Sequence, residues 1–339
     1  MAITIKPIDN KQTWEQFVMS IKPNQFLQSW NTGHQYQTLG EKIFRLGIYD
    51  GGELAGVCFL TKTEAKRGTY LFCPYGPLIK DWKNDQLFTD FANNLKDLAK
   101  KEGADFVRIN PFVEDTVENR NIFRKNEFKN APMHTIAETL WILDITQSEE
   151  DILKGMRKNT RYLVRRAEKE GVKIHTSQDA SDVKKFFKVY EETSKRHHFV
   201  PYSLEFLEGQ VNSFKEDDQV LIYFAEYEGK IISTAIIMFY GDQGSYHHGA
   251  SLSEYSKIPT SYLLQWEAIK EAKKRGCTQY NFWGIVEDQP KHPFAGISLF
   301  KKGFGGYRYD LLHCQDLPVT KKYYLTKVFE TLRKKKRGF

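Results

Sequence analysis

The sequence contains few cysteines and no long apolar run, and both absences narrow the class of protein. Its 339 residues include only Cys58, Cys73, Cys277 and Cys314, with no C-x-x-C pair. Cysteines scattered in this way argue against a disulfide framework and a zinc site, and they favour reduced thiols in the cytosol. The most apolar run, residues 235–240, is far too short to cross a bilayer and predicts a buried strand.

The chain also lacks an amino-terminal targeting segment and a strong charge of one sign. Its first residues, MAITIKPIDNKQTW, contain no long apolar stretch of the signal-peptide type, so a cytoplasmic location is expected. The net charge of +7 is mild, which makes the distribution of charge more informative than its sum. With 40% hydrophobic residues the chain is expected to fold, and its length favours two domains.

The two halves of the sequence repeat one order of elements. Strand–turn–strand hairpins are predicted at residues 44–60 and 220–240, with glycines at both turns. A short strand follows each hairpin and ends in Gly76 or Gly249.

A long amphipathic helix comes next in both halves and closes on AKKEG or AKKRG. The final glycines, Gly103 and Gly276, are typical of helix C-caps behind lysine-rich last turns. An alternating strand follows each helix, at 104–110 and 277–283, and each half begins with a helical stretch, at 10–20 and 181–196. Gly76 and Gly249 are 173 residues apart, and so are Gly103 and Gly276.

This order of elements is that of the GNAT acetyltransferase fold. We therefore predict an α/β (α+β) protein with two tandem GNAT-like domains, each a mixed central sheet flanked by helices. The expected domains are residues 1–147 and 148–339, divided just after a strand at 139–145. The alternative is two generic α/β domains in which the turns and helix-ending glycines happen to follow a similar order.

The acyl donor is expected to differ from acetyl-CoA. GNAT enzymes hold the CoA pyrophosphate on the backbone amides of a glycine-rich turn, R/Q-x-x-G-x-G/A, at a helix N-terminus. The corresponding stretches, residues 75–88 and 247–266, lack that turn.

A basic helix is predicted at residues 151–171, between a capping pair, Ser148 and Asp151, and the stop at Gly171. Between residues 154 and 173 there are eight basic and two acidic residues. Repulsion among so many cations is tolerable where a polyanion neutralises them, although a solvated surface helix is the alternative. The candidate RNA-binding residues are Arg157, Lys158, Arg161, Arg165 and Arg166, and the family resemblance given below implies that the RNA is tRNA. A second basic cluster, at residues 333–337, is expected to be a frayed tail, with RNA or an anionic membrane as the other option.

Four segments together resemble the Fem family of non-ribosomal peptidoglycan bridge aminoacyltransferases. They are FLQSWNTGHQY at 26–36, RKNTRYLVRRAEKEGVKI at 157–174, SYLLQWEAIKEAKKRGCTQYNFWGI at 261–285 and LFKKGFGG at 299–306. The resemblance implies transfer of an amino acid from aminoacyl-tRNA to the stem-peptide amine of a peptidoglycan precursor, either UDP-MurNAc-peptide or lipid II. Residues 150–218 leave no room for the coiled-coil arm of some members, so the compact FemX type is expected. A monomer without cofactor or metal is predicted, and a peripheral membrane contact stays open.

The segment FKKGFGG at residues 300–306 is the candidate catalytic motif. Attack of an amine on the reactive ester needs no protein nucleophile, but a fixed positive charge would stabilise the oxyanion or bind the tRNA 3′ phosphates. The resemblance places the Phe-Lys pair at the catalytic centre, which assigns Phe300 and Lys301. A turn or bulge with surface lysines is the alternative reading of this motif.

Further candidates for substrate binding are Lys302, Arg196, Tyr202, Tyr246, His248 and Trp283. Since neighbouring strand residues point to opposite faces, at most one of His247 and His248 can face a cleft. No metal-ligand spacing accompanies them.

The sequence departs from the family pattern at three places. Asn281 stands where many relatives have Asp, Tyr202 and Phe206 occupy the positions of an Arg and a Tyr, and Gln37 replaces a lysine. Two other functions stay open: the same fold with acyl-CoA or another acyl donor, and a non-catalytic module that binds RNA or an anionic glycan.

Overall fold

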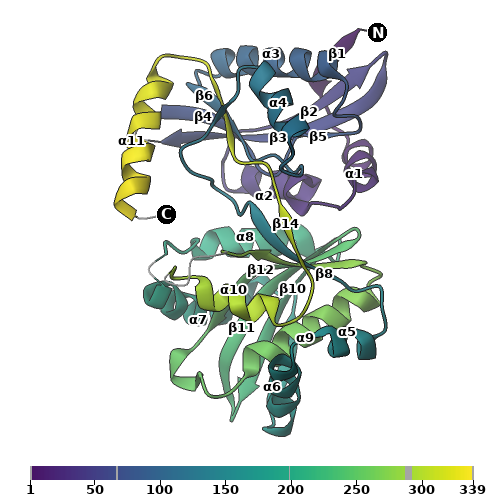
Figure 1. Ribbon diagram of the computed structural model, residues 1–339, viewed down its shortest axis with the longest axis vertical. Helices are drawn as coiled ribbons and strands as arrows, with labels where there is room; N and C mark the ends of the chain where they lie inside the picture. The colour runs from purple at the N-terminus through teal and green to yellow at the C-terminus, as the bar shows by residue number, and fades with distance from the viewer. Residues whose placement is uncertain (1, 66–67, 198, 287–291, 338–339) are drawn as a thin grey trace. The chain divides into compact units, whose positions relative to one another are not determined.

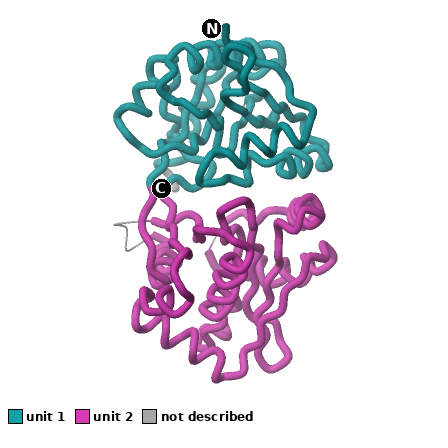
Figure 2. The backbone as a smooth tube through the Cα atoms, turned by 90° about the vertical axis from the view of Figure 1, so that its right-hand side faces the viewer, with its two compact units in different colours: residues 1–138, 310–339 teal, residues 139–309 magenta. Residues whose placement is uncertain are grey.

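In the computed structural model, which describes residues 2–65, 68–197, 199–286 and 292–337, the chain forms two units (Figure 1). Unit 1 comprises Met1–Glu138 and Asp310–Phe339, and unit 2 comprises Thr139–Tyr309 (Figure 2). Each unit contains its own mixed sheet and its own apolar core.

The sheet of unit 1 is covered on one face by α3 and α4, and on the other by α1 and α2. Its strands run in the order β1 (Ile3–Pro7), β2 (Ile43–Asp50), β3 (Glu53–Ala65), β4 (Gly68–Cys73), β6 (Phe106–Ile109), β15 (Gln315–Pro318) and β7 (Lys129–Asn130), with β5 (Leu78–Ile79) paired to β3. The helices are α1 (Lys11–Ser20), α2 (Trp30–Thr38), α3 (Asp85–Lys101), α4 (Val117–Lys125) and α11 (Lys322–Arg337).

The sheet of unit 2 is covered by α6 and α9 on one face and by α7 and α8 on the other. Its strands run in the order β14 (Tyr307–Asp310), β8 (Thr139–Asp144), β13 (Gln279–Gly284), β12 (Gln243–Ser251), β11 (Lys230–Tyr240), β10 (Val220–Tyr227) and β9 (Lys173–Ser177). The helices are α5 (Glu149–Gly155), α6 (Lys158–Lys169), α7 (Val183–His197), α8 (Leu204–Lys215), α9 (Thr260–Lys274) and α10 (Ala295–Lys302).

The predicted duplication is confirmed strand by strand. In unit 1, β2, β3 and β4 are successively antiparallel and β4 is parallel to β6; in unit 2, β10, β11, β12 and β13 repeat that pattern. The predicted C-cap glycines have left-handed backbones, with φ of +66° at Gly103 and +82° at Gly276. The two GNAT-like domains expected from the repeat are therefore present.

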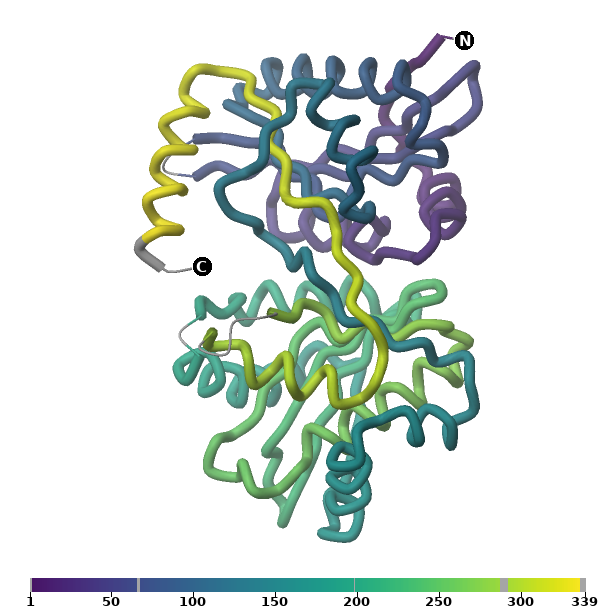
Figure 3. Tube along the Cα trace, in the orientation of Figure 1, coloured from purple at the N-terminus to yellow at the C-terminus, as the bar shows by residue number. Residues whose placement is uncertain are grey.

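The division of the chain differs from the predicted boundary at 147/148 because the two units exchange strands. Strand β8 pairs antiparallel with β13 of unit 2, although it was assigned to the first domain. Conversely, β15 pairs antiparallel with β6 of unit 1, and α11 packs on β4 beside it. Figure 3 follows the C-terminal segment back into the first unit. Residues 310–339 thus belong to the N-terminal domain.

The predicted basic helix at 151–171 is two helices rather than one. Helix α5 starts at the predicted cap, where Ser148 accepts a hydrogen bond from the backbone N–H of Asp151 at 3.2 Å, and it ends at Gly155. Met156 then adopts an extended conformation with its side chain buried, and α6 begins after Arg157. Arg157 is therefore the N-cap residue of α6 and not part of a continuous helix from residue 151.

The helices between β8 and β10 have 7, 12, 15 and 12 residues, so the part of the chain that the structure describes contains no coiled-coil arm. In the same described residues, none of the helices combines the length and the apolar character that a bilayer crossing requires.

Candidate active site

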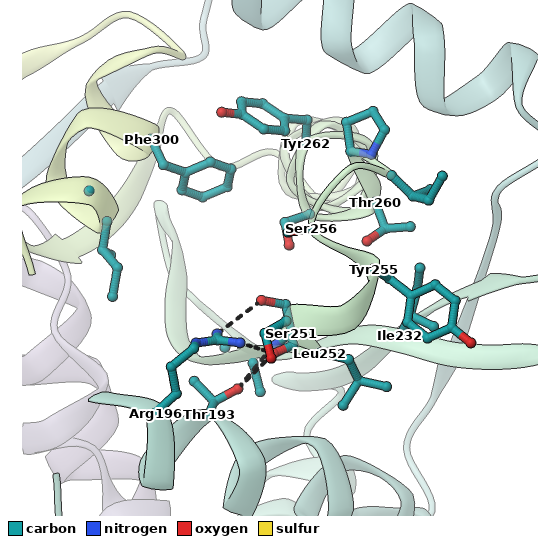
Figure 4. Close-up of a pocket in the computed structure, with 18 of the residues that line it drawn as sticks. Thr193, Arg196, Ile232, Ser251, Leu252, Tyr255, Ser256, Thr260, Tyr262 and Phe300 are labelled. Atoms are coloured by element: carbon teal, nitrogen blue, oxygen red, sulfur yellow. Dashed lines mark hydrogen bonds between the residues drawn. The ribbon is translucent and has the colours of Figure 1, made fainter. Parts of the chain in front are cut away.

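A cavity of about 900 Å³ lies in unit 2, among β12, the start of α9, α10 and the end of α7 (Figure 4). Five of the predicted catalytic and substrate-binding residues line it together, as does one arginine of α6. They are Phe300, Lys301, Arg196, Tyr246, Trp283 and Arg166.

A bulge in β12 shapes the floor of the cavity. Ile237 pairs with Tyr246 and Ile236 with His248, so His247 is the extra residue. An added Cβ at Gly249 would lie only 1.8 Å from the Tyr246 hydroxyl oxygen, which shows that the tyrosine ring occupies the space above this glycine. The glycine predicted to end the repeated strand therefore gives Tyr246 its position in the cavity wall.

Replacement of Gly249 by alanine is expected to displace Tyr246 and to lower kcat/KM at least about tenfold, with a loss of stability of about 1–3 kcal/mol from overpacking. The matched control is Gly296→Ala, since Gly296 also lines the cavity but has no atom within 4 Å of an added Cβ. Steady-state kinetics and thermal unfolding of both variants make the comparison. Equal behaviour of the two variants would contradict the role of Gly249.

A second irregularity, at the end of β13, places Trp283 in the cavity wall. The register between β13 and β8 shifts between Asn281 and Gly284, and Trp283 has a φ of +67°, a strained backbone for a large side chain. The Asn281 side chain accepts a hydrogen bond from the Trp283 N–H at 2.8 Å and donates to Gln243 Oε1 at 3.0 Å. Asn281 is fully buried and fixes this bend. The asparagine that stands where many relatives have Asp therefore has a structural role.

Lys301 is buried with only 7% of its surface exposed. Its amine donates a hydrogen bond to the carbonyl oxygen of Gly284 at 2.5 Å and lies 5.9 Å from the centroid of the Tyr246 ring. Burial lowers the pKa of Lys301 to about 7. The sequence led us to expect a lysine that carries a fixed positive charge. With a pKa of about 7, Lys301 instead exists near neutral pH as a mixture of its ammonium and its neutral amine.

Aromatic side chains pack around Phe300, the first residue of the candidate catalytic motif, near the end of α10. The Phe300 ring lies 4.9 Å from the ring of Tyr262 on α9 and 5.3 Å from that of Phe304. Phe304 in turn contacts Phe282 of β13 at 5.1 Å. The alternative reading as a bulge is excluded, because Phe300, Lys301 and Lys302 are the last residues of a helix.

The glycines of the motif admit protein neighbours rather than substrate. A Cβ at Gly303 would lie 2.4 Å from Thr160 Oγ1 of α6, and one at Gly306 would lie 2.2 Å from the carbonyl oxygen of Ile142 in β8. The close backbone approach expected at these glycines thus joins α10 to α6 and to the exchanged strand.

The charged side chains among the described residues of the cavity wall are all basic. The lining includes no Asp or Glu, and it contains Arg166, Arg196, Lys257 and Lys301 together with two histidines, His197 and His247. The Arg196 guanidinium donates to Ser251 through Nη1 to the carbonyl oxygen at 2.9 Å and through Nη2 to Oγ at 3.4 Å (Figure 4). Helix α9 begins at the cavity without a side-chain cap, and its N-terminal dipole adds to the positive potential. This wall is suited to an anionic ligand.

Three of the predicted residues lie outside the cavity. The Lys302 amine lies 5.5 Å from the centroid of the Trp141 ring, and Tyr202 stacks on Phe206 at 4.6 Å. His248 is buried against Tyr202 and lines no part of the cavity, whereas His247 does. The bulge decides between the two histidines, and alternation along a regular strand could not predict its place. No group of three or more His, Cys, Asp or Glu side chains that could hold a metal occurs among the residues described.

The basic residues predicted to bind tRNA have three different environments. Arg161 caps α5, since its Nη1 donates to the carbonyl oxygens of Lys154 at 2.5 Å and Met156 at 3.3 Å. Arg166 pairs with Glu170 at 2.7 Å and reaches the cavity wall. Arg157, Lys158 and Arg165 are exposed.

One exposed residue of α6, Tyr162, was not among the residues predicted to bind RNA. It is 59% exposed and lies one turn after Lys158 and about one turn before Arg165, on the same helix face. An aromatic ring between two cations is typical of surfaces that bind single-stranded nucleic acid. The i, i+4, i+7 spacing of Lys158, Tyr162 and Arg165 in the sequence could have predicted that they share one helix face.

In unit 1, a cation lies beside the position where the resemblance led us to expect a lysine. Arg45 donates to Gln37 Oε1 at 3.5 Å and to the carbonyl oxygen of Trp30 at 3.0 Å, with its guanidinium 3.7 Å from the centroid of the Trp30 ring. Burial lowers the pKa of Arg45 to about 10, so it remains charged at neutral pH.

Known proteins resemble the chain over both units. Residues 10–141 match the FemAB family, and residues 154–292 match the acetyltransferase (GNAT) domain. The Staphylococcus aureus protein "Lipid II:glycine glycyltransferase" is 21% identical over 373 aligned positions, which cover 87% of this chain and 88% of the relative. Residues 10–141 thus carry a match to the FemAB family, and residues 154–292 a match to a GNAT domain.

Solved structures agree with the fold of the chain over both units. The crystal structure of FemX has a TM-score of 0.82 at 19% identity and covers 97% of this chain and 100% of its own. A tandem GNAT protein from the clavulanic acid biosynthesis pathway has a TM-score of 0.61 at 10% identity, with 94% and 99% covered. The chain thus has the fold of tandem GNAT proteins.

Proposed function

We propose that this protein transfers an aminoacyl group from aminoacyl-tRNA to the stem-peptide amine of a peptidoglycan precursor, either UDP-MurNAc-peptide or lipid II. Its match to the FemAB family and its likeness to a lipid II:glycine glycyltransferase support the acceptor class. The observation that supports aminoacyl-tRNA as the donor is the cavity of unit 2. Its described lining residues include basic side chains, the Phe300–Lys301 pair and no Asp or Glu.

The cavity suits the 3′ end of a charged tRNA. Its volume of about 900 Å³ is at the upper end of the range of small-ligand pockets, which is enough for an aminoacyl-nucleoside. Phosphates would be held by Arg196, Lys257 and the N-terminus of α9. The rings of Tyr246 and Trp283 offer faces on which a base can stack.

The exposed face of α6 would bind the tRNA body. Lys158, Tyr162 and Arg165 follow one another along this face, and none of the three has its charge or ring buried. Phosphates would neutralise the mutual repulsion of the cations and release counterions, so binding should weaken as salt rises.

The chemistry can be completed by Lys301 without a covalent enzyme intermediate. The neutral acceptor amine attacks the ester carbonyl carbon, and the Lys301 ammonium hydrogen-bonds to the resulting oxyanion. As the bond from the carbonyl carbon to the ribose oxygen breaks, Lys301 gives its proton to that oxygen. It then regains a proton from the newly formed ammonium, which leaves a neutral amide. A pKa of about 7 suits both transfers, because acid and base forms coexist at the working pH.

The test is incubation of the protein with charged bulk tRNA and with each precursor, followed by mass spectrometry of the products. The expected product is a precursor heavier by one amino-acid residue, and its mass identifies both the amino acid and the acceptor. Acyl-CoA without tRNA is the parallel reaction. An acylated product from acyl-CoA alone, or no turnover with either donor, would exclude the proposal.

The contribution of α6 is tested with Lys158→Glu/Arg165→Glu. This variant is expected to bind tRNA at least about tenfold more weakly at low salt, with a reduced slope of log affinity against log salt. The matched control is Lys184→Glu/Lys188→Glu, which reverses two exposed lysines four residues apart on α7 of the same unit. Equal losses in both variants would leave only a general charge effect and would rule out α6 as the binding face.

A further inference from the structure

The C-terminal helix α11 is fixed to unit 1 through one face. Tyr323 is fully buried with its ring 5.3 Å from that of Phe106, and Thr326 is also buried. Glu330 accepts two hydrogen bonds from Arg108, at 2.7 and 3.1 Å. The spacing of Tyr323, Thr326 and Glu330 places all three along the same side of the helix.

The opposite face of α11 carries four large apolar side chains in contact with solvent. Tyr324 is 47% exposed, Leu325 74%, Val328 59% and Leu332 59%. Leu325, Val328 and Leu332 recur at intervals of three and four, so they form a stripe along the helix. Together with Tyr324 they make up four of the ten exposed large hydrophobic side chains of the described residues, which sets this face apart from the scattered others.

Positive charge surrounds the apolar stripe. Residues 321–337 contain eight basic residues and a single acid, Glu330, which is engaged by Arg108 on the inner face. Lys321 and Lys322 lie at one end, and Arg333, Lys334 and Lys335 lie exposed at the other. Lys129 adds a further cation beside the stripe, where its amine donates to the Tyr324 hydroxyl at 2.8 Å.

We propose that the outer face of α11 binds the surface of an anionic lipid bilayer, with the helix lying parallel to the membrane plane. Leucine and valine would enter the boundary between headgroups and acyl chains, while the lysines and arginines contact lipid phosphates. A second copy of this chain is a poor occupant, because an isologous contact would bring the same cations together. RNA would satisfy the cations but leave the apolar stripe exposed to water.

Membrane binding by α11 would favour lipid II over soluble UDP-MurNAc-peptide as the acceptor, and this part of the inference rests on the proposed function. The membrane contact itself does not, since it can be measured without transfer.

The test is co-sedimentation of the full chain with vesicles of phosphatidylcholine containing about one-third phosphatidylglycerol, against vesicles of phosphatidylcholine alone. The wild-type protein is expected to bind the anionic vesicles, and less so at high salt. Leu325→Ser/Val328→Ser/Leu332→Ser should weaken binding more than about tenfold. Arg333→Gln/Lys334→Gln/Lys335→Gln should weaken it about tenfold to a hundredfold at low salt.

The matched control is Val117→Ser/Lys100→Gln/Lys101→Gln, which changes an exposed apolar residue and two exposed lysines elsewhere in unit 1. It should bind like the wild type. Equal binding of the wild type and the serine variant to anionic vesicles would overturn the proposal, and so would a wild-type dimer that the serine variant loses in light scattering. If vesicles bind but no aminoacyl product forms from any precursor, the proposed function fails and the membrane surface stands.

Discussion

Replacement of Lys301 by methionine is expected to lower kcat about a hundredfold to a thousandfold and to raise the stability of the folded protein. The loss of rate follows from removal of the group that donates to the oxyanion and to the departing ribose oxygen. The gain in stability follows from burial, because the pKa of Lys301 is lowered from 10.5 to about 7 and its charged form is therefore disfavoured in the folded state.

The stability gain depends on pH in a defined direction. Below about pH 7 the lysine is protonated in both the folded and the unfolded chain, so the full cost of the buried charge is present. Between about pH 7 and pH 10.5 only the unfolded chain holds this proton, and the stability of the wild type rises with pH. The methionine variant should thus be more stable than the wild type by about 1–3 kcal/mol at pH 6, after the lost hydrogen bond to Gly284 is subtracted, and by less at pH 9.

Denaturant unfolding at the two pH values and single-turnover kinetics with charged tRNA measure the two effects. The control is Lys302→Met, which removes the neighbouring cation outside the cavity and should keep most of the activity. The alkaline limb of the wild-type kcat/KM profile should fall with an apparent pKa near 7, and Lys301→Arg should lack that limb. A methionine variant with wild-type kcat would refute the assignment of Lys301 to the reaction.

Replacement of Arg108 by methionine is expected to destabilise unit 1 by about 3–5 kcal/mol. Arg108 is buried and joins strand β6 to the two returning C-terminal elements. It donates to Asp316 of β15 at 2.7 and 2.9 Å and to Glu330 of α11 at 2.7 and 3.1 Å. Without the guanidinium, the fully buried carboxylate of Asp316 would have no cation, and burial already raises its pKa.

The matched control for Arg108 is Arg120→Met. Arg120 also makes a two-pronged pair with a carboxylate, Asp115, but its side chain is 57% exposed, so the change should have little effect on stability. Arg108→Met/Asp316→Leu removes both buried charges and should recover part of the loss. Chemical denaturation measures all three variants, and a similar small effect of Arg108→Met and Arg120→Met would show that the buried pair does not hold the C-terminal segment.

The repeat was predictable because the sequence features that reveal it are local. Hairpin turns, helix-ending glycines and alternating strands all follow from residues close together in the chain, and they predicted both GNAT-like sheets. The choice of Phe300 and Lys301 came from the resemblance to the Fem family. The exchange of β8 and β15 was not predictable in this way. Gln315 pairs with Ile109 across more than 200 residues, and no local pattern shows which distant strand a given strand will pair with.

Parts of the candidate site also depend on packing that sequence periodicity cannot show. The choice of His247 over His248 depends on one bulge, and the role of Arg161 as a cap depends on a break at Met156 inside an otherwise helical pattern. The charge state of Lys301 depends on how deeply α10 packs against β13. The basic residues of the sequence therefore indicated the part of the chain that forms the candidate site. Only the folded structure shows which of them line the cavity and which support it.

The exchanged strands also have a consequence for biogenesis. A ribosome finishes residues 1–138 long before it reaches β15 and α11, so the nascent N-terminal domain has an open edge at β6 and an uncompensated Arg108 while the second domain is made. The second domain has its last sheet strands, β14 and the already synthesised β8, as soon as residue 310 has emerged. We expect the C-terminal domain to mature first, and the first-made domain to close last.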